Sequence, residues 1–390
     1  MEKDKINLAL FWPQYRNKIT SLNDLVLGLD PERYKVIFVY LSGYGVKKNL
    51  IEEAGYEVFY LSNIKLINAF RFSILFRLIK ILKENHIDIL HCHHHKPSFY
   101  GALAGIFAKT PVVLSHVHGL GRTRNIGRRM LNFLLFRRFN RIIGCASGVR
   151  DNVLKNNPSV HPEKVAVLEN SVDFDRFNNV SITKVDVKQM LGLPPDTFIF
   201  GTIGRLAPTK GQSYLIEAFE EAKKRKSSAH LILVGDGRCR TELEEQASKT
   251  PCSDAIHFLG YRNDIEQLLK GMDVFVLSSI AEGMPLVILE AMAVGIPCIS
   301  TRVGGIAEVI SSDEVGILVP SKDSRALANA MIELGGASRE QLEKYAEKAR
   351  YRIQQFYSHD VIRKKLENTY EIEMNHYFKN DRFQKSNQQV

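Results

Sequence analysis

The sequence has few cysteines and no long hydrophobic segment. Its five cysteines lie far apart, their number is odd, and no two of them form a Cys-x-x-Cys pair. This spacing supports neither a disulfide framework nor a cysteine-bound zinc cluster, and it fits a reducing cytosol. No apolar run reaches the roughly 18 uncharged residues of a spanning helix, and Ile6–Trp12 is too short for a signal-peptide core. We therefore expect a cytoplasmic protein, without an export signal, whose membrane contact is peripheral on the inner face of the cell membrane.

The composition is that of a large globular protein with a positive charge. A chain of 390 residues exceeds the roughly 250–300 at which one hydrophobic core stops growing, so two domains are predicted. With 45% hydrophobic and 25% charged residues, the chain resembles ordinary soluble proteins. The net charge of +10 favours anionic partners, which include nucleic acid, anionic membranes and phosphorylated metabolites, and charge alone does not choose among them.

Short apolar runs alternate with helical patterns in both halves of the chain, which predicts an α/β fold with parallel, doubly wound sheets. Together the halves predict two Rossmann-like domains facing across a cleft. The expected strands are 6–11, 35–40, 87–91, 112–115, 142–146 and 165–168, then 198–203, 230–234, 256–259, 274–277, 297–300 and 316–319. The expected helices include 64–84, 100–108, 213–226 and 285–293. The predicted division is a first domain (1–172), a polar linker (173–197), a second domain (198–360), a helix packing back on the first domain (361–378) and a disordered tail (379–390).

One segment of the second half combines two glutamates with the start of a helix. Glu282 precedes Gly283, Met284 and Pro285, and Glu290 follows within the expected helix. A proline suits the first helical position, so we predict that the helix begins at Pro285. The free N–H groups and the positive dipole end at such a terminus attract a phosphate. Taken alone, the two glutamates are explained as well by a structural role, with Glu282 as a capping acid and Glu290 as an exposed helical residue, as by contacts with a sugar and with nucleoside hydroxyls.

A loop after the first strand of the second half carries two cations. The segment Gly201–Gly211 runs from an expected strand into an expected helix and contains Arg205 and Lys210. Arginine and lysine can neutralise a diphosphate there, although a solvated basic loop is the alternative for such a motif by itself. Both cations and the helix at Pro285 are expected at the carboxyl ends of parallel strands, where open α/β sheets bind ligands. This coincidence favours a functional site.

Several motifs resemble the family 4 retaining glycosyltransferases. Those of the second half are 201–211, 234–237, 273–279, 282–290 and 303–308, and those of the first half are 88–96, 111–119 and 167–173. The resemblance spans about residues 85–320 and keeps the order of the motifs. It implies a GT-B fold, a nucleotide sugar bound mainly by the second domain, an acceptor on the side of the first domain, and no cofactor or metal ion.

The resemblance also implies roles for individual residues. By position, Arg205 and Lys210 would hold the diphosphate, Glu290 the ribose and Glu282 the hydroxyls of the donor sugar, while His118 would lie beside the reacting carbon. The implied catalytic residues are therefore His118, Glu282, Arg205 and Lys210. The implied donor-binding residues are Gly204, Arg205, Lys210, Gly260, Tyr261, Glu282, Gly283, Met284, Pro285, Leu286 and Glu290, of which Gly260 and Tyr261 are the weaker transfer.

Histidines cluster in the first half and suggest a metal site as an alternative. His91, His93, His94, His95, His116 and His118 lie on or next to expected strands, where alternate residues share a face, and imidazole is a good zinc ligand. The ligand spacings typical of zinc sites are absent, so we expect most of these histidines to be polar residues at strand ends that line the cleft, and we expect no metal ligand. The Asp173-Phe174-Asp175 triplet falls in the expected linker and is interpreted as a turn.

A basic segment follows the histidines. Residues 121–150 contain eight arginines and no acid, and the apolar run 130–136 is flanked by arginine doublets. Such doublets suit an anionic lipid surface, whereas a core helix with solvated ends explains them as well. We expect the Arg122–Arg141 segment to bind an anionic membrane surface.

The function that fits these features best is retaining, metal-independent transfer of a sugar from a nucleotide diphosphate to a glycan or lipid-linked acceptor. The family resemblance places such a transfer in lipopolysaccharide, O-antigen or capsule synthesis. The alternatives are a sugar-nucleotide epimerase or phosphorylase of the same fold, and a basic membrane- or nucleic-acid-binding protein without enzymatic activity. The last alternative does not require Arg205, Lys210, Glu282 and Glu290 together, so we expect no nucleic acid partner.

Overall fold

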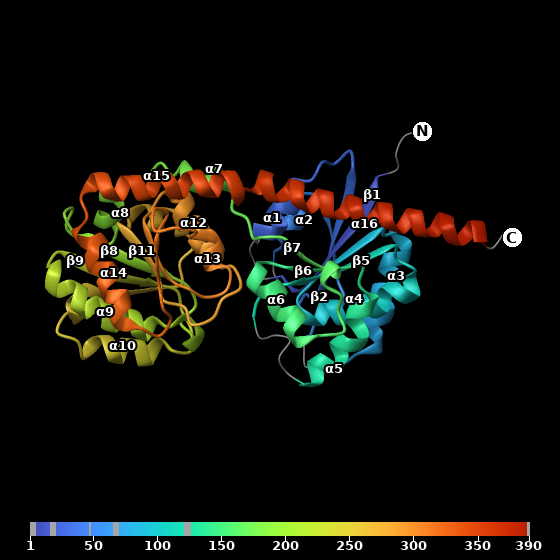
Figure 1. Ribbon diagram of the computed structural model, residues 1–390, viewed down its shortest axis with the longest axis horizontal. Coiled ribbons are helices and arrows are strands. Elements are labelled where there is room, and N and C mark those ends of the chain that lie inside the picture. The colour runs from blue at the N-terminus through green and yellow to red at the C-terminus, as the bar shows by residue number, and fades with distance from the viewer. Residues whose placement is uncertain (1–4, 16–20, 47, 65–69, 121–125, 388–390) are drawn as a thin grey trace. The chain divides into compact units, whose positions relative to one another are not determined.

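The structure is a computed structural model that describes residues 5–15, 21–46, 48–64, 70–120 and 126–387. Internal contacts divide the chain into two compact units (Figure 1). Unit 1 consists of Met1–Glu169 with Ile362–Val390, and unit 2 of Asn170–Val361. Among the described residues, no helix combines the length and the apolar character needed to cross a membrane.

Unit 1 is built on a sheet of seven parallel strands in the order β3-β2-β1-β4-β5-β6-β7. The strands are β1 (Ile6–Gln14), β2 (Tyr34–Ser42), β3 (Glu57–Tyr60), β4 (Ile89–His93), β5 (Val112–Val117), β6 (Arg141–Gly144) and β7 (Val165–Val167). The helices that precede the C-terminal one are α1 (Ser21–Leu27), α2 (Leu50–Glu53), α3 (Phe72–Glu84), α4 (His95–Ala108), α5 (Ile126–Leu135) and α6 (Ser147–Asn156), with short 3-10 turns η1 (Phe136–Arg138) and η2 (Pro162–Lys164).

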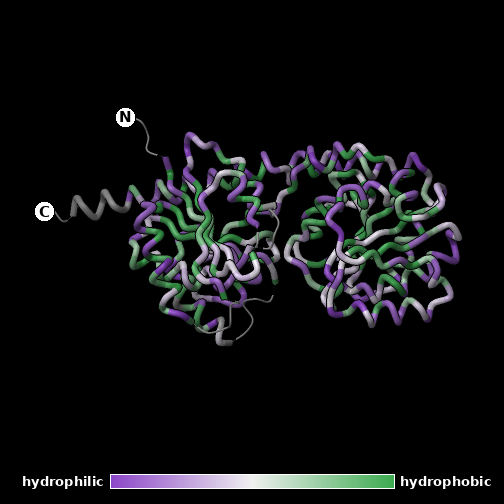
Figure 2. The backbone as a smooth tube through the Cα atoms, turned by 180° about the vertical axis from the view of Figure 1, so that it is seen from behind, coloured by the Kyte–Doolittle hydropathy of each residue, from purple (hydrophilic) through white to green (hydrophobic). Residues whose placement is uncertain are grey.

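Side chains on both faces of the unit 1 sheet are buried under helices, as a parallel sheet requires. Successive residues of β1 alternate between the faces, so that Ala9 and Phe11 join one core cluster and Leu8 and Leu10 the other. The first cluster includes residues of α3 and the second includes residues of α16 (His359–Asn387). In Figure 2, where the backbone is coloured by residue hydropathy, the strands are mostly hydrophobic and the surrounding helices are more hydrophilic.

Unit 2 repeats the architecture with six parallel strands in the order β10-β9-β8-β11-β12-β13. The strands are β8 (Phe198–Ile203), β9 (Ala229–Val234), β10 (Ile256–Gly260), β11 (Val274–Leu277), β12 (Cys298–Thr301) and β13 (Ile317–Val319). The helices are α7 (Phe174–Asn178), α8 (Lys184–Met190), α9 (Gln212–Arg225), α10 (Arg240–Ser248), α11 (Ile265–Gly271), α12 (Leu286–Val294), α13 (Ile306–Val309), α14 (Ser324–Gly336) and α15 (Arg339–Phe356), with 3-10 turns η3 (Pro208–Lys210) and η4 (Ser253–Ala255).

The order of the strands locates a ligand-binding position in each sheet. In both units the chain first adds strands on one side of the first strand and then on the other. The reversal lies between β1 and β4 in unit 1 and between β8 and β11 in unit 2. Open α/β sheets bind ligands beyond the carboxyl ends of the strands at such a switch point. The two doubly wound sheets confirm the predicted fold class.

The structure differs from the sequence-based boundaries in several places. The expected helix 64–84 is α3, which begins only at Phe72, and part of that range (65–69) lies outside the described residues. Strand β3 was not predicted, because it has four residues at the sheet edge and none of them is fully buried. Helices α7 and α8 occupy the range 173–197 that we interpreted as a linker. The tail was predicted to be disordered from residue 379, yet α16 continues to Asn387, since adding residues to an existing helix is far easier than starting one.

Candidate functional site

The candidate site of unit 2 is formed by the two loops at its switch point. One loop connects β8 to α9 and carries Arg205 and Lys210; the other connects β11 to α12 and carries Glu282. Since β8 and β11 are hydrogen-bonded neighbours, both loops leave the same edge of the sheet. The tertiary structure thereby brings together residues that are 72 positions apart in the sequence.

Lys210 and Glu282 are in direct contact. The Lys210 ammonium donates to Oε1 of Glu282 at 2.5 Å, and the Ser279 hydroxyl donates to the same oxygen at 2.6 Å. The two charged side chains retain only 19% and 12% of their exposure, so the pair is mostly withdrawn from water. The ammonium of Lys210 is therefore already oriented by a carboxylate, and Ser279 is a member of this cluster that the sequence motif did not single out.

Backbone contacts hold the two loops together. The Ser278 hydroxyl donates to the carbonyl oxygen of Lys210 at 3.1 Å, and the Ile280 N–H donates to the carbonyl oxygen of Thr209 at 2.8 Å. Gly211 adopts a φ of +62°, and a Cβ atom there would lie 2.3 Å from the Ser278 carbonyl oxygen. Glycine is thus required at this position both for its conformation and for the close approach of the β11 loop.

Arg205 lies on the same loop with a different environment. Its carbonyl oxygen accepts from the Gln212 side chain at 3.1 Å, which fixes the backbone. Its side chain is exposed and makes no ion pair with any residue that the structure describes. Gly204, directly before it, approaches the loop after β9 so closely that a Cβ on Gly235 would lie 2.1 Å from the Gly204 carbonyl oxygen. The loop is therefore rigid, while the guanidinium at its surface remains available to an anion.

The segment from Glu282 to Pro285 is held by the neighbouring loops. The Gly305 N–H donates to the carbonyl oxygen of Gly283 at 2.6 Å, and the Asn170 side chain donates to that of Met284 at 2.7 Å. A Cβ on Gly304 would lie 2.2 Å from the Glu282 carbonyl oxygen. These contacts fix the direction in which the chain enters α12.

The start of α12 differs by one residue from the prediction. Pro285 was expected at the first helical position, but its ψ of 128° is extended, so it is the N-cap and Leu286 begins the helix. Proline has no side-chain oxygen to cap the helix, and no side-chain cap is present. The first N–H groups of α12 therefore remain available to an anion at the edge where Glu282 lies.

The remaining donor-site residues are more dispersed. Glu290 is half-buried on α12, more than one turn beyond Leu286. Gly260, at the end of β10, has a φ of +65°, and its carbonyl oxygen accepts from the Gly235 N–H at 2.7 Å. The neighbouring Tyr261 is 68% exposed. These residues belong to unit 2, and the structure shows no direct contact of Tyr261 with the Lys210–Glu282 pair among the described residues.

His118 belongs to unit 1, where it follows the end of β5. Its Nε2 atom lies 3.2 Å from Nδ1 of His93, and the His93 ring stacks on Trp12 with centroids 4.0 Å apart. Neither Trp12 nor its contact with the histidines was predicted, since a single aromatic residue in a strand is more often part of the core. His118 is thus held by an aromatic and imidazole cluster at the carboxyl ends of β1, β4 and β5.

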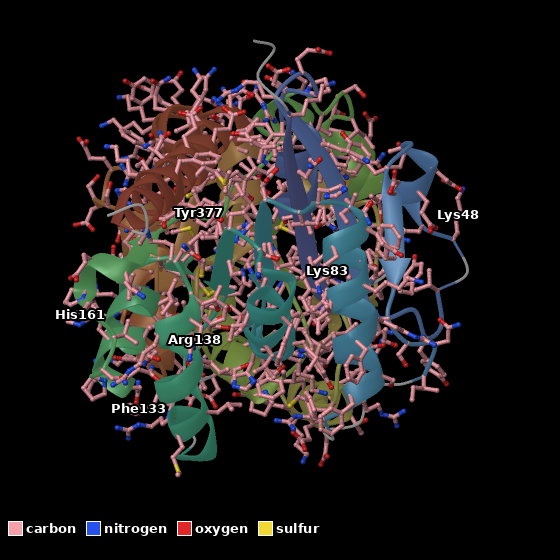
Figure 3. The ribbon with its side chains drawn as sticks, turned by 90° about the vertical axis from the view of Figure 1, so that its right-hand side faces the viewer. Lys48, Lys83, Phe133, Arg138, His161 and Tyr377 are labelled. Carbon is pink, nitrogen blue, oxygen red and sulfur yellow. The ribbon has the colours of Figure 1, made fainter. Side chains whose placement is uncertain are left out.

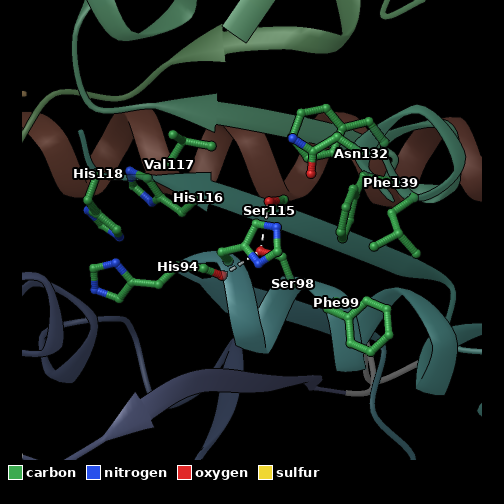
Figure 4. Close-up of a pocket in the computed structure, with 12 residues that line it drawn as sticks. His94, Ser98, Phe99, Ser115, His116, Val117, His118, Asn132 and Phe139 are labelled. Atoms are coloured by element: carbon green, nitrogen blue, oxygen red, sulfur yellow. Dashed lines mark hydrogen bonds between the residues drawn. The ribbon is translucent and has the colours of Figure 1, made fainter. Parts of the chain in front are cut away.

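A pocket opens beside His118 (Figure 4). It lies between α4, β5, α5 and η1, and its lining includes His94, Phe99, His118, Asn132 and Phe139. The side-chain nitrogen of Asn132 is buried and has no hydrogen-bond partner among the described residues. Polar groups next to aromatic rings are suited to a ligand that has both hydroxyl groups and apolar faces, such as a sugar.

The histidines do not all lie where the sequence interpretation put them. His94, His95 and His118 are half-buried, whereas His91, His93 and His116 are no more than 1% exposed. The expectation that most of the six line a cleft therefore does not hold for His91 and His93, whereas the buried His116 still lines the pocket beside His118. Their rings face the core cluster that α16 completes, because that cluster covers the same face of β4 and β5.

The Arg122–Arg141 segment is described only from residue 126, and Arg122 and Arg124 lie outside the described residues. In α5, Met130 is 70% and Phe133 46% exposed, while Asn132 and Leu135 are buried. The Arg137 guanidinium lies over the Phe133 ring at 4.3 Å from its centroid. Figure 3 shows Phe133 and Arg138 at the surface of this region. The helix has a distinct exposed face on which apolar side chains adjoin arginines.

Comparison with known proteins identifies the family. Residues 20–176 match the family described as Glycosyltransferase Family 4, and residues 184–352 match the family described as Glycosyl transferases group 1. The chain is 32% identical over 282 residues to the UDP-Gal:alpha-D-GlcNAc-diphosphoundecaprenol alpha-1,3-galactosyltransferase of Escherichia coli, a match that covers 70% of this chain and 72% of the relative.

Solved structures show the same fold. Anabaena Alr3699/HepE in complex with UDP and glucose has a TM-score of 0.80 at 23% identity, over 93% of this chain and 98% of that one. A glycosyltransferase from Rickettsia africae ESF-5 has a TM-score of 0.81 at 19% identity, over 95% of this chain and 99% of the other. These matches, together with the family matches in both units, confirm the resemblance found in the motifs. The chain belongs to the family 4 glycosyltransferases and is an enzyme of the GT-B fold.

Proposed function

We propose that the protein transfers a sugar from a UDP-sugar to a glycan or lipid-linked acceptor in surface polysaccharide synthesis, with retention of configuration and without a metal ion. The observation that best supports a donor site here is the Lys210–Glu282 contact at the carboxyl ends of β8 and β11, beside the exposed Arg205. The Escherichia coli relative supports the substrate classes, because its name specifies a UDP-sugar and a lipid diphosphate acceptor. The binding of UDP and glucose by Anabaena HepE supports the same donor class.

The chemical task is to stabilise a departing diphosphate. When the bond between the sugar carbon and the phosphate oxygen breaks, its electron pair passes to the UDP, and the sugar acquires oxocarbenium character. Arg205, Lys210 and the N-terminus of α12 would stabilise the growing negative charge on UDP. The acceptor hydroxyl attacks from the same face and its proton passes to the leaving phosphate, which retains the configuration. No metal is required for this step, since two cations and the N-terminus of α12 would surround the diphosphate.

The remaining residues have separate proposed roles. Glu282 would bind the hydroxyls of the donor sugar and Glu290 the ribose, with Gly260 and Tyr261 near the base. His118 would act beside the reacting carbon, and the pocket next to it would receive the acceptor. The unpartnered Asn132 amide nitrogen and the aromatic lining of this pocket support a sugar-containing acceptor.

Substitution of Lys210 tests the donor site. We expect Lys210→Ala to lower turnover by about 10²- to 10³-fold, because one charge that stabilises the transition state is removed. A thermal-shift screen of UDP-, GDP- and ADP-sugars identifies the donor, and the release of UDP from that donor measures turnover. Wild-type turnover in Lys210→Ala would exclude this residue from the mechanism.

A matched control uses another lysine in unit 2. Lys249 is 71% exposed and pairs with Glu245 one helical turn away. We expect Lys249→Ala to retain full turnover. Release of UDP must accompany formation of a new glycosidic product, because an epimerase would convert the nucleotide sugar without releasing UDP, and a phosphorylase would consume phosphate.

We also propose that α5 binds an anionic membrane surface on the cytoplasmic side. The exposed Met130 and Phe133 would enter the headgroup region while Arg129, Arg137 and Arg138 contact lipid phosphates. Sedimentation with vesicles tests the proposal. Vesicles that contain phosphatidylglycerol should bind the wild-type chain, and Met130→Ser/Phe133→Ser should bind severalfold less; equal binding to neutral and anionic vesicles would contradict it.

A further inference from the structure

Three buried histidines to which the proposed sugar transfer gives no chemical role lie together in unit 1, and one of them, His116, also lines the pocket beside His118. His91 and His93 alternate on β4 and therefore share a face of the sheet. The register of β4 and β5 pairs His93 with His116, which places the third histidine on the same face. One ring nitrogen of each histidine lies within 4.8 Å of those of the other two. All three side chains are 0–1% exposed.

On two of these rings, the Nδ1 atom has a hydrogen-bond partner. Nδ1 of His91 lies 2.8 Å from the Tyr370 hydroxyl, and Nδ1 of His93 lies 3.2 Å from Nε2 of His118. When each Nδ1–H donates to its partner, the lone pair of the ring is left on Nε2. In metal-binding histidines, the ring nitrogen that does not bind the metal usually donates to another group, which orients the ring.

The other ring nitrogens of the three histidines have no hydrogen-bond partner among the described residues. Nε2 of His91, Nε2 of His93 and both ring nitrogens of His116 are buried without a hydrogen bond to any residue that the structure describes. An unsatisfied buried polar group costs about 1–3 kcal/mol, and here such nitrogens belong to three neighbouring rings whose centroids lie 4.3–5.4 Å apart. Neutral rings with free lone pairs are the form of histidine that binds a metal.

We propose that His91, His93 and His116 bind one divalent transition-metal ion, Zn²⁺ by the nature of the ligands, in a buried site that holds β4 and β5 together beneath α16. Three imidazole ligands suit zinc, with water or hydroxide as the fourth ligand. A triangle with sides of 4.8 Å has its centre about 2.8 Å from each corner, whereas Zn–N bonds are about 2.0–2.1 Å long. Movements of each ring by less than about 1 Å therefore complete the site.

The site is separate from the proposed donor chemistry. The cations that would stabilise the departing UDP, Arg205 and Lys210, belong to unit 2, whereas the three histidines belong to unit 1. His93 also contacts His118, so the ion would fix the orientation of His118 indirectly through His93. We therefore expect metal removal to lower the stability of unit 1 while UDP binding persists.

The first experiment measures metal content. The full chain, prepared without a histidine tag, is incubated with Zn²⁺, dialysed and examined by elemental mass spectrometry. We expect about one Zn²⁺ per chain in the wild type and less than a tenth of that in His116→Gln. His257→Gln is the matched control, because His230 and His257 also form a pair, at 2.8 Å, in unit 2; this variant should bind as much Zn²⁺ as the wild type. Wild-type protein without zinc, or zinc retained in His116→Gln, would overturn the proposal.

The second experiment does not depend on the folding of a variant. Wild-type chain loaded with Co²⁺ should show the intense visible absorption of tetrahedral cobalt, whereas weak octahedral bands or no bands would contradict a tetrahedral site at the three histidines. Zn²⁺ should raise the melting temperature of the stripped wild type, because a ligand of the native state stabilises it. UDP titrated into the zinc-free chain by calorimetry then separates the two proposals, since loss of UDP binding in Lys210→Ala concerns the donor site and leaves zinc binding unchanged.

Discussion

At the residue scale, the proposed donor site depends on a contact that no local pattern predicts. The types and positions of Arg205, Lys210 and Glu282 indicated phosphate and sugar chemistry. Their motifs did not indicate that Lys210 and Ser279 both donate to the same carboxylate oxygen, Oε1 of Glu282. In the absence of donor, the carboxylate is the counter-charge of the lysine, and a bound diphosphate has to share that lysine with it.

Substitution of Glu282 separates its effect on UDP binding from its effect on turnover. In Glu282→Gln, Lys210 loses its counter-charge, so we expect UDP to bind as tightly as in the wild type or severalfold more tightly. Turnover should nevertheless fall at least about tenfold, because the donor sugar loses a charged hydrogen-bond acceptor that strengthens in the transition state. Calorimetry with UDP and the rate of UDP release from the donor measure the two quantities.

The exposed carboxylate of Glu245 provides the control, since it pairs with Lys249 away from the loops, and Glu245→Gln should match the wild type. A parallel loss of UDP binding and turnover in Glu282→Gln would show that the glutamate mainly maintains the loop.

The histidines show that the burial of a strand face cannot be predicted from the sequence of the strand itself. Alternation along the strands correctly placed His91 and His93 on one face. Whether that face was covered depended on α16, whose Tyr370 and Leu366 lie about 270 residues later in the chain and complete the core there. The expectation of a cleft lining was therefore wrong for His91 and His93, which lie in the core.

At the element scale, short parallel strands were the most predictable feature. Strands β8 and β11 have the boundaries expected from their apolar runs, and β9 and β12 differ by one residue. Buried central strands are nearly continuous apolar runs, so their signal is strong, whereas the edge strand β3 has no fully buried residue and escaped prediction. The start of α12 shifted by one residue because loop contacts, and not proline preference alone, set the backbone angles of Pro285.

The turn between η3 and α9 is the element whose geometry the site needs most. In Gly211→Ala, the new Cβ atom would lie 2.3 Å from the Ser278 carbonyl oxygen, so the β8 and β11 loops have to separate. We expect a loss of more than about 2 kcal/mol in the free energy of unfolding, from left-handed strain together with the clash. UDP binding should weaken as well. Urea denaturation and calorimetry measure these effects.

Gly192 supplies the matched control. Its φ of +70° imposes a similar strain, but no atom lies within 4 Å of a Cβ built there. Gly192→Ala should cost about 1 kcal/mol and leave UDP binding unchanged. Equal losses in both glycine variants, with normal UDP binding in each, would show that the contact with Ser278 is unimportant.

At the scale of the whole molecule, unit 1 depends on the last helix of the chain. Ile362, Leu366, Tyr370 and Met374 of α16 are 0–5% exposed and belong to the core cluster that contains Leu8 and Leu10 of β1. The polar pattern of the tail gave no sign that its helix continues to Asn387. A single C-terminal segment therefore completes a core whose other buried residues lie between Leu8 and Leu168.

Truncation tests this dependence. A chain that ends at Val361 loses all four buried side chains, and we expect unit 1 to unfold or to melt at a much lower temperature. A chain that ends at Phe378 keeps these four side chains and should melt as the full chain does. Differential scanning calorimetry measures the transitions, and UDP binding should persist in both truncated chains because the donor residues belong to unit 2. An unchanged melting profile of the shorter chain would contradict the role of α16.

By itself, the sequence determined the two-domain α/β fold, the family and the chemical character of the donor loops. These follow from local information, namely apolar periodicity, glycines at strand ends and charged residues at fixed spacings. The tertiary structure decided which residues meet: Lys210 with Glu282, Gly211 with Ser278, and three histidines beneath Tyr370. Contacts between distant segments depend on strand order and on the helices that cover each face of a sheet, and neither is encoded in a local pattern.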